Sequence, residues 1–162
     1  KKYNPKGVDT VKKAYEYASE VHKNDIRKSG DPYMHHPLNT AYILTDLQAD
    51  SDTISAALLH DTVHIGKADI NDIEKNFGKD IADLVSGITK INNLNVFTDS
   101  EMQINYYKKI IVGMSEDVRV IIVKLADRLH NFRTLWAKPS RMRILQNLKK
   151  SSLSLTSRIR RL

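Results

Sequence analysis

Four residues of this 162-residue chain are candidates for a divalent metal site, and they come from three separate stretches. His36 precedes Pro37 at the expected start of a helix. His60 and Asp61 stand together at the end of an apolar helical run, and Asp127 lies inside a long helical segment. Two imidazoles and two carboxylates suit an ion such as Mn²⁺ and leave positions open for water and a phosphate oxygen. The set therefore favours an open Mn²⁺ site over a closed zinc site.

The His60-Asp61 pair alone is weak evidence for a metal ion. A histidine at a helix end is more often bonded to a neighbouring carboxylate than to a metal, and that reading stays open for the pair by itself. The prediction of a metal site depends on all four candidates meeting in space, and so on how the helices are arranged.

The elements that must position these residues are amphipathic helices, and we predict an all-α fold, a helical bundle of about seven to nine helices. Asp9 is expected to cap the first helix. The helix that starts at Pro37 is expected to bury Ala41, Leu44 and Leu47. Gly78 is expected to stop the short helix formed by "INDIEKNF".

The segment "VRVIIV", residues 118–123, has two possible structures. It is apolar and β-branched enough for a buried strand. Its continuation "KLADRLHNFRTL" has helical spacing at Leu125, Leu129 and Phe132, which favours one long helix carrying Asp127. A cap at Ser115 is expected to open that helix.

Length and composition favour one soluble domain. The mass is 18.5 kDa and 41% of the residues are hydrophobic, which suits a single sizeable core. The chain has no cysteine, so disulfides and thiolate metal sites are excluded. No apolar run is long enough to span a bilayer, and the first residues, "KKYNPKGVDT", lack the apolar part of a secretory signal. We therefore expect a cytoplasmic protein with no membrane partner.

The formal charge of +7 suggests nucleic-acid binding at first sight, but the charge is unevenly distributed. Five of the 26 Lys and Arg residues, and none of the 19 Asp and Glu residues, lie in residues 149–162. We therefore expect a domain over 1–148 and a basic, Ser-rich C-terminal tail over 149–162. That tail is either a disordered or packed stub, which we favour, or a basic anchor for RNA or anionic lipid.

Several motifs together resemble the RelA/SpoT family, whose HD-type hydrolase domain removes pyrophosphate from the 3′ position of ppGpp and pppGpp. The matching stretches are "RKSGDPYMHHP" (27–37), "AALLHDTV" (56–63), "DIEKNFG" (72–78), "LVSGITK" (84–90) and "VIIVKLADRLHNFRTL" (120–135). They follow the family's order and spacing over residues 8–148. The resemblance implies an HD-domain helical bundle, with Mn²⁺ as cofactor held by His36, His60, Asp61 and Asp127.

The same resemblance implies a pocket for a guanosine polyphosphate. Arg27 corresponds to the residue that stacks on the guanine, since a guanidinium can stack and hydrogen-bond at once. Lys28 and Ser29 lie where the family holds base and phosphates, although a charged pair in a polar loop is by itself only a solvated turn. The ribose and base would be contacted by residues that follow Asp127, namely Asn131, Arg133 and Thr134. Tyr33 and His35 also stand in the matching stretch, and neither is assigned a role.

The sequence departs from the family directly after "HDTV", where relatives have Glu-Asp and this chain has His64 and Ile65. The acidic pair is credited in the family with activating the attacking water. A neutral imidazole at His64 could accept a proton, whereas isoleucine can neither take a proton nor orient water. His64 is therefore the candidate catalytic base, and hydrolysis is expected to be weak or lost.

Three functions are compatible with the sequence. The first is a metal-dependent alarmone hydrolase of impaired activity. The second is a pseudoenzyme that binds metal and guanosine nucleotide without efficient hydrolysis. The third is a nucleic-acid-binding module acting through the tail, which the complete metal-ligand set disfavours. The sequence does not indicate an oligomeric state.

Overall fold

The computed structural model describes residues 5–27, 30–92 and 117–134, and the side chains of Pro5, Lys6, His64 and Asn92 are outside that description. The described part holds six helices: α1 (Pro5–Val21), α2 (His35–Asp46), α3 (Ser51–His64), α4 (Ile70–Phe77), α5 (Lys79–Asn92) and α7 (Val118–Arg133). Extended pairing among these residues is limited to one bridge between Ile26 and Pro32. The all-α prediction is confirmed, while the expected seven to nine helices also include segments outside the described ranges.

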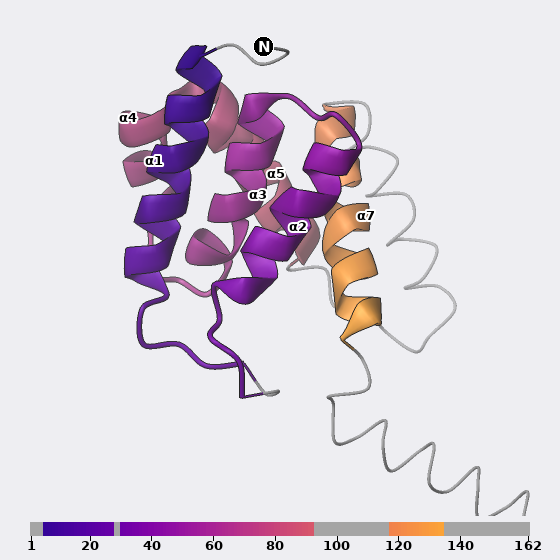
Figure 1. Ribbon diagram of the computed structural model, residues 1–162. Helices are drawn as coiled ribbons and strands as arrows, with labels where there is room; N and C mark the ends of the chain where they lie inside the picture. Colours follow the sequence, from indigo (N-terminus) through magenta and orange to yellow (C-terminus); the bar gives the residue numbers. More distant parts are fainter. Residues whose placement is uncertain (1–4, 28–29, 93–116, 135–162) are drawn as a thin grey trace, which may run out of the picture.

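Helix α3 lies at the centre of the bundle, in contact with α1, α2, α5 and α7 (Figure 1). Every residue from Thr53 to Thr62 is buried, so the helix is enclosed on all sides. Leu44 of α2, Leu58 and Leu59 of α3, and Val85 of α5 are among the fully buried side chains of the core around it. A helix buried in this way holds its polar residues, His60 and Asp61 included, inside the protein.

The ends of three helices are set by capping residues, of which only Gly78 was predicted from the sequence. Asp50 and Asp117 cap α3 and α7 by accepting hydrogen bonds from the backbone N–H of Thr53 and Arg119. Gly78 ends α4 with a φ of 89°, as expected. The prediction that Asp9 caps the first helix is wrong, because α1 already begins at Pro5.

The segment over 118–123 is helical, which confirms the helix and excludes the strand. Helix α7 begins at Val118 and not at the expected cap Ser115, which lies outside the described residues. Its buried face follows a spacing of three and four residues through Val120, Val123, Asp127 and His130.

Four leucine and phenylalanine side chains that we expected to mark buried faces are exposed. They are Leu47, just after α2, and Leu125, Leu129 and Phe132 on α7, with exposures from 42% to 64%. On α7 these three apolar residues do recur with helical spacing, but they lie on the exposed face of the helix and not on the buried one. The buried stripe contains polar residues, because it faces a polar site inside the bundle.

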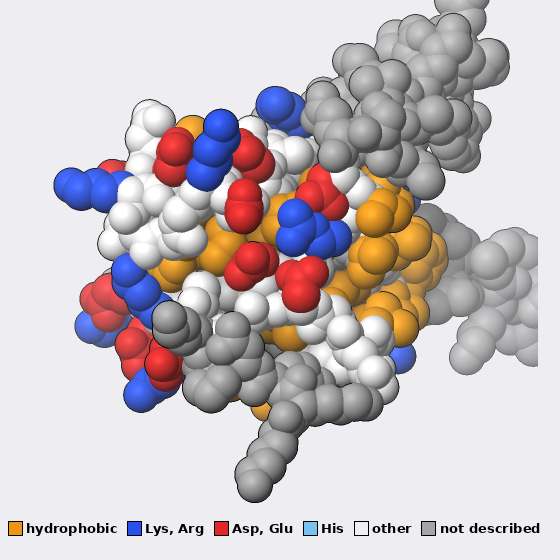
Figure 2. All heavy atoms as spheres, turned by 90° about the horizontal axis from the view of Figure 1, so that it is seen from above, with side chains coloured by type: hydrophobic (Ala, Val, Ile, Leu, Met, Phe, Trp, Pro, Cys, Tyr) orange, Lys and Arg blue, Asp and Glu red, His pale blue; other side chains and the backbone are white. Residues whose placement is uncertain are grey.

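The face of the bundle seen from above carries acidic and basic side chains close together, with hydrophobic side chains gathered at one edge (Figure 2). Among the described residues, Arg119 is paired with Asp117 at 2.7 Å and with Asp50 at 3.7 Å. Alternating charges of this kind differ from the single-sign basic surface that phosphate backbones select. Among the described residues, no helix is long and apolar enough to cross a membrane.

Candidate metal centre

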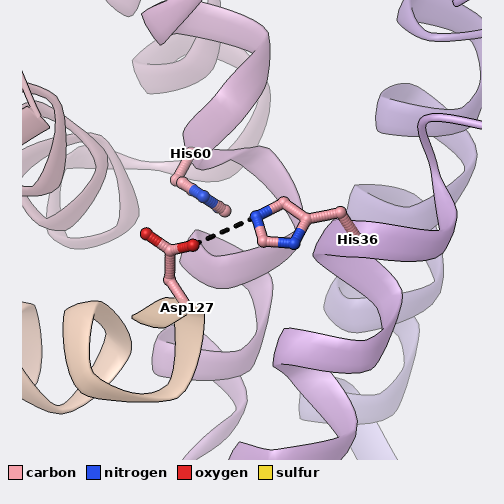
Figure 3. Close-up of side chains that lie close together, drawn as sticks. All are labelled: His36, His60 and Asp127. Carbon is pink, nitrogen blue, oxygen red and sulfur yellow. Dashed lines mark ion pairs between the residues drawn. The ribbon is translucent and has the colours of Figure 1, made fainter. Parts of the chain in front are cut away.

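Three of the four predicted ligands meet between α2, α3 and α7: His36, His60 and Asp127 (Figure 3). One ligand atom from each lies within 4.8 Å of the other two, and all three residues are buried. His36 Nε2 is 3.1 Å from Asp127 Oδ1, and the rings of His36 and His60 meet edge to face with centroids 5.9 Å apart. Two imidazole nitrogens and a carboxylate oxygen around one point form a donor set that fits a divalent ion.

The orientation of His60 supports this fit. Its Nδ1 lies 2.7 Å from the carbonyl oxygen of Ala57, one turn earlier in α3, so that nitrogen carries the proton. Its Nε2 is buried and has no hydrogen-bond partner within the described part of the chain. An unpartnered buried nitrogen is costly to a protein unless something else binds it. The lone pair of His60 Nε2 is thus available to a metal ion.

Asp61, the fourth predicted ligand, lies next to the cluster of His36, His60 and Asp127 but is not part of it. Its Oδ1 lies 3.2 Å from His60 Nε2 and its Oδ2 lies 3.7 Å from His36 Nε2. The hydroxyl of Tyr33 donates a hydrogen bond to Asp61 Oδ2 at 3.1 Å. Burial by itself raises the pKa of Asp61, but the adjacent imidazoles of His60 and His36 outweigh it and lower the pKa, so the carboxylate is ionised.

Tyr33 therefore has a structural role that its place in the sequence did not reveal. Its ring stacks on the buried ring of His22, with centroids 4.7 Å apart. Burial, followed by the charge of Asp61, raises its pKa, which keeps the hydroxyl protonated as the donor to Asp61. The neighbouring His35 is exposed.

Asp127 is the most heavily bonded member of the centre. Its Oδ1 accepts a hydrogen bond of 2.7 Å from the amide of Asn131, and its Oδ2 accepts one from the ammonium of Lys124. Burial by itself raises the pKa of Asp127, but the hydrogen bond to His36 and the charge of Lys124 lower it well below its ordinary value. The carboxylate therefore stays ionised, which is the form that binding of a metal ion would require.

Another buried histidine, which was not among the residues predicted from the sequence, adjoins the centre. His130 Nδ1 lies 2.8 Å from His36 Nδ1, and the two rings are tilted by 41°. Burial, and then the neighbouring His36 and the guanidinium of Arg27, lower the pKa of His130 to about 4, so its ring is neutral. The available signal was its spacing of three residues from Asp127, which places both on one face of α7.

The predicted nucleotide residues are only partly within the described structure. Arg27 donates a hydrogen bond from Nη2 to Asn131 Oδ1 at 3.1 Å, so these two residues do come together. The hydroxyl of Thr134 bonds to the carbonyl oxygens of His130 and Asn131 at the end of α7, and Arg133 is exposed. Two further predicted residues, Lys28 and Ser29, lie outside the described residues.

His64 and Ile65 lie one helical turn after His60 and Asp61, at the end of α3. The helix includes His64, whose side chain is among those not described. Ile65 is the C-cap residue and is 38% exposed. The loop that follows is tied down by Lys67, whose Nζ lies 2.5 Å from both carboxylate oxygens of Asp25.

Comparison with known proteins gives consistent matches. The family model described as HD domain matches residues 14–154. The chain is 48% identical over 125 residues to the GTP pyrophosphokinase rsh of Brucella melitensis, covering 77% of this chain and 17% of that protein. It is 41% identical over 128 residues to the bifunctional (p)ppGpp synthase/hydrolase SpoT of Escherichia coli, covering 79% of this chain and 18% of that protein. The chain thus spans less than a fifth of the length of these relatives.

The fold is also similar to a solved structure of a metazoan ortholog of SpoT, described as hydrolysing ppGpp and playing a role in starvation responses. The TM-score is 0.65 and the sequences are 31% identical. The match covers 80% of this chain and 72% of that one. Sequence and structure therefore point to the same family.

Proposed function

The chain belongs to the HD domain family and to its RelA/SpoT branch, and from this we propose that it is a metal-dependent 3′-pyrophosphohydrolase domain for ppGpp and pppGpp. The observation that carries the proposal is the buried cluster of His36, His60 and Asp127. It joins a donor set for a divalent ion to a helix that also carries candidate nucleotide contacts. The proposed domain covers residues 1–148, with 149–162 as a separate tail.

In this proposal His36, His60, Asp61 and Asp127 hold one Mn²⁺ ion. Such an ion, when bound, supplies positive charge to a phosphate oxygen and to the attacking water. The protein's own contribution is a buried, prearranged set of ligands. Asn131 and Lys124 hold Asp127 in place by hydrogen bonds, and the carbonyl of Ala57 does so for His60.

The proposed nucleotide site starts at Arg27, which bonds to Asn131 and so lies one side chain away from Asp127. We propose that guanine stacks on the Arg27 guanidinium and that the 3′ pyrophosphate is bound at the metal. We assign phosphate and base contacts to Lys28 and Ser29, and ribose and base contacts to Asn131, Arg133 and Thr134. Lysine supplies a compact cation for phosphate, and arginine a fork of donors.

The proposed activity is weak, because residues 64 and 65 hold no carboxylate. A positioned general base typically contributes about 10²–10⁴-fold in rate. His64 is the remaining group in that position able to accept a proton, and we propose it as the substitute base. The second candidate is a pseudoenzyme that binds Mn²⁺ and guanosine nucleotide without efficient hydrolysis. The observation that favours it is Ile65, which is partly exposed at the end of α3 and has no group to orient water.

The test is the release of pyrophosphate from ppGpp by the purified chain, with Mn²⁺ and after its removal by a chelator. Slow release that requires Mn²⁺ and disappears in Asp127→Asn supports the impaired hydrolase. Binding of Mn²⁺ and ppGpp with no release supports the pseudoenzyme. Turnover at many per second contradicts the proposed impairment, and failure to bind either ligand contradicts both candidates.

A further inference from the structure

The two ring nitrogens of His36 face different partners. Nε2 lies 3.1 Å from Asp127 Oδ1 and 3.7 Å from Asp61 Oδ2, so it is directed into the metal centre. Nδ1 points the other way and lies 2.8 Å from Nδ1 of His130. A neutral imidazole has one N–H, so a proton on one of these nitrogens leaves the other free.

The partner of His36 differs from that of His60. The Nδ1 of His60 faces the carbonyl oxygen of Ala57, which only accepts, so in the neutral ring of His60 the proton lies on Nδ1 and Nε2 is the unprotonated nitrogen. The partner of His36 is another imidazole nitrogen, which accepts or donates according to its tautomer. The tautomer of His36 is therefore not fixed by the backbone. It depends on His130.

A single proton can lie between the two Nδ1 atoms at 2.8 Å. With that proton on His36, its Nε2 is free to bind a cation, and His130 carries its own proton on Nε2. With the proton on His130, a neutral His36 is protonated at Nε2 and is bonded to Asp127 instead. The first arrangement admits a metal ion, and the second blocks the ligand nitrogen.

We propose that His130 is the positioning residue of the metal centre, accepting the Nδ1 proton of His36 and so keeping His36 Nε2 free for the ion. This inference rests on the proposed function, because it assumes that His36 is a ligand. Outer groups that orient metal-binding histidines typically alter metal affinity by about 10–100-fold when they are removed. His130 is buried and adjacent to the ring that it orients, as such a group must be.

Two substitutions of equal shape separate hydrogen bonding from packing. In His130→Asn the side-chain oxygen occupies nearly the position of the imidazole Nδ1, because both atoms are bonded to Cγ, and it still accepts a hydrogen bond. His130→Leu has the same branched shape without an acceptor. We expect the dissociation constant for Mn²⁺, measured from the paramagnetic resonance signal of the free ion, to rise at least tenfold in His130→Leu. In His130→Asn it should stay within about threefold of the wild-type value, as in the control His35→Leu, which alters an exposed histidine.

Equal Mn²⁺ affinity in His130→Leu and His130→Asn would overturn the inference while leaving the metal site intact. A wild-type protein that binds no Mn²⁺ would instead overturn the proposed function. Should His130→Leu fail to fold, long-range proton–nitrogen NMR of the wild-type protein loaded with diamagnetic Zn²⁺ shows which ring nitrogen of His130 carries the proton. His130 must then be protonated at Nε2 and unprotonated at Nδ1, and a proton found on His130 Nδ1 contradicts the inference.

Discussion

Arg27 and Asn131, which are 104 positions apart in the sequence, are joined by a hydrogen bond of 3.1 Å from the guanidinium to the amide oxygen. The amide nitrogen of Asn131 donates to Asp127 at 2.7 Å. One side chain therefore connects the residue proposed to stack on guanine with a proposed metal ligand. Binding of the base and binding of the ion are thus expected to occur in adjoining parts of one site.

The substitution Arg27→Ala should weaken binding of ppGpp by about 1–2 kcal/mol through lost stacking. Calorimetry in the presence of Mn²⁺ measures this directly. The matched variant Arg27→Lys keeps the charge but loses the planar stacking group, so it should recover only part of the affinity. Equal affinity of the wild-type protein for guanosine and adenosine polyphosphates would argue against the assigned pocket.

His60→Leu should abolish stabilisation by Mn²⁺ while changing the metal-free protein little. Leucine removes Nε2, which is both the proposed ligand nitrogen and an unpartnered buried atom, and it also removes the hydrogen bond from Nδ1 to the Ala57 carbonyl. Because these two effects oppose each other, the free energy of unfolding without metal should shift by no more than about 1.5 kcal/mol. In the wild-type protein, Mn²⁺ at a hundred times its dissociation constant should add about 2.7 kcal/mol. Urea unfolding with and without Mn²⁺ gives both numbers. A variant that keeps the full Mn²⁺ effect would remove His60 from the ligand set.

The double substitution His64→Glu with Ile65→Asp should raise Mn²⁺-dependent hydrolysis of ppGpp at least tenfold, at the low end of what a general base contributes. The control is His64→Gln with Ile65→Asn, which has nearly the same shapes and no carboxylate, and which should give no increase. Pyrophosphate release is the measurement. A folded Glu-Asp variant that binds Mn²⁺ and ppGpp but gains no activity would place the defect elsewhere in the chain.

Stability in acid should depend on Asp117, the cap of α7. The hydrogen bonds from the Arg119 side chain lower the pKa of Asp117 in the folded protein. A lowered folded pKa stabilises the protein above the unfolded pKa of about 3.9, and this contribution is lost as pH falls through the folded value. Asp117→Ala should therefore cost about 1 kcal/mol at pH 7 and less below pH 4.

The control for the cap is Asp117→Asn, whose side-chain oxygen still accepts the N–H of Arg119 but cannot titrate. Its stability relative to Asp117→Ala should be independent of pH. Urea unfolding at pH 7 and pH 3 makes the comparison. A cost of Asp117→Ala that is the same at both pH values would show that the charge of Asp117 contributes nothing.

Much of the candidate metal centre was predictable from residue types. His36, His60 and Asp127 stand in stretches that are helical by periodicity, and rigid helices carry ligands at fixed spacing. Their meeting was confirmed by the structure. The end of α4 at Gly78 was as expected for a similar reason, since a positive φ is a property of a single residue.

The sequence by itself determined which residue types are available: the ligand chemistry, the helical class, and the absence of a carboxylate at positions 64 and 65. Only the tertiary structure decided which face of each helix is buried. Leu125 and Phe132 are exposed while Asp127 and His130 are buried, because polar groups that bond to one another can replace apolar packing inside a bundle. The contacts between His130 and His36 and between Tyr33 and Asp61 depend on how helices cross. Local propensity carries no information about such crossings, since they are set by packing between distant segments.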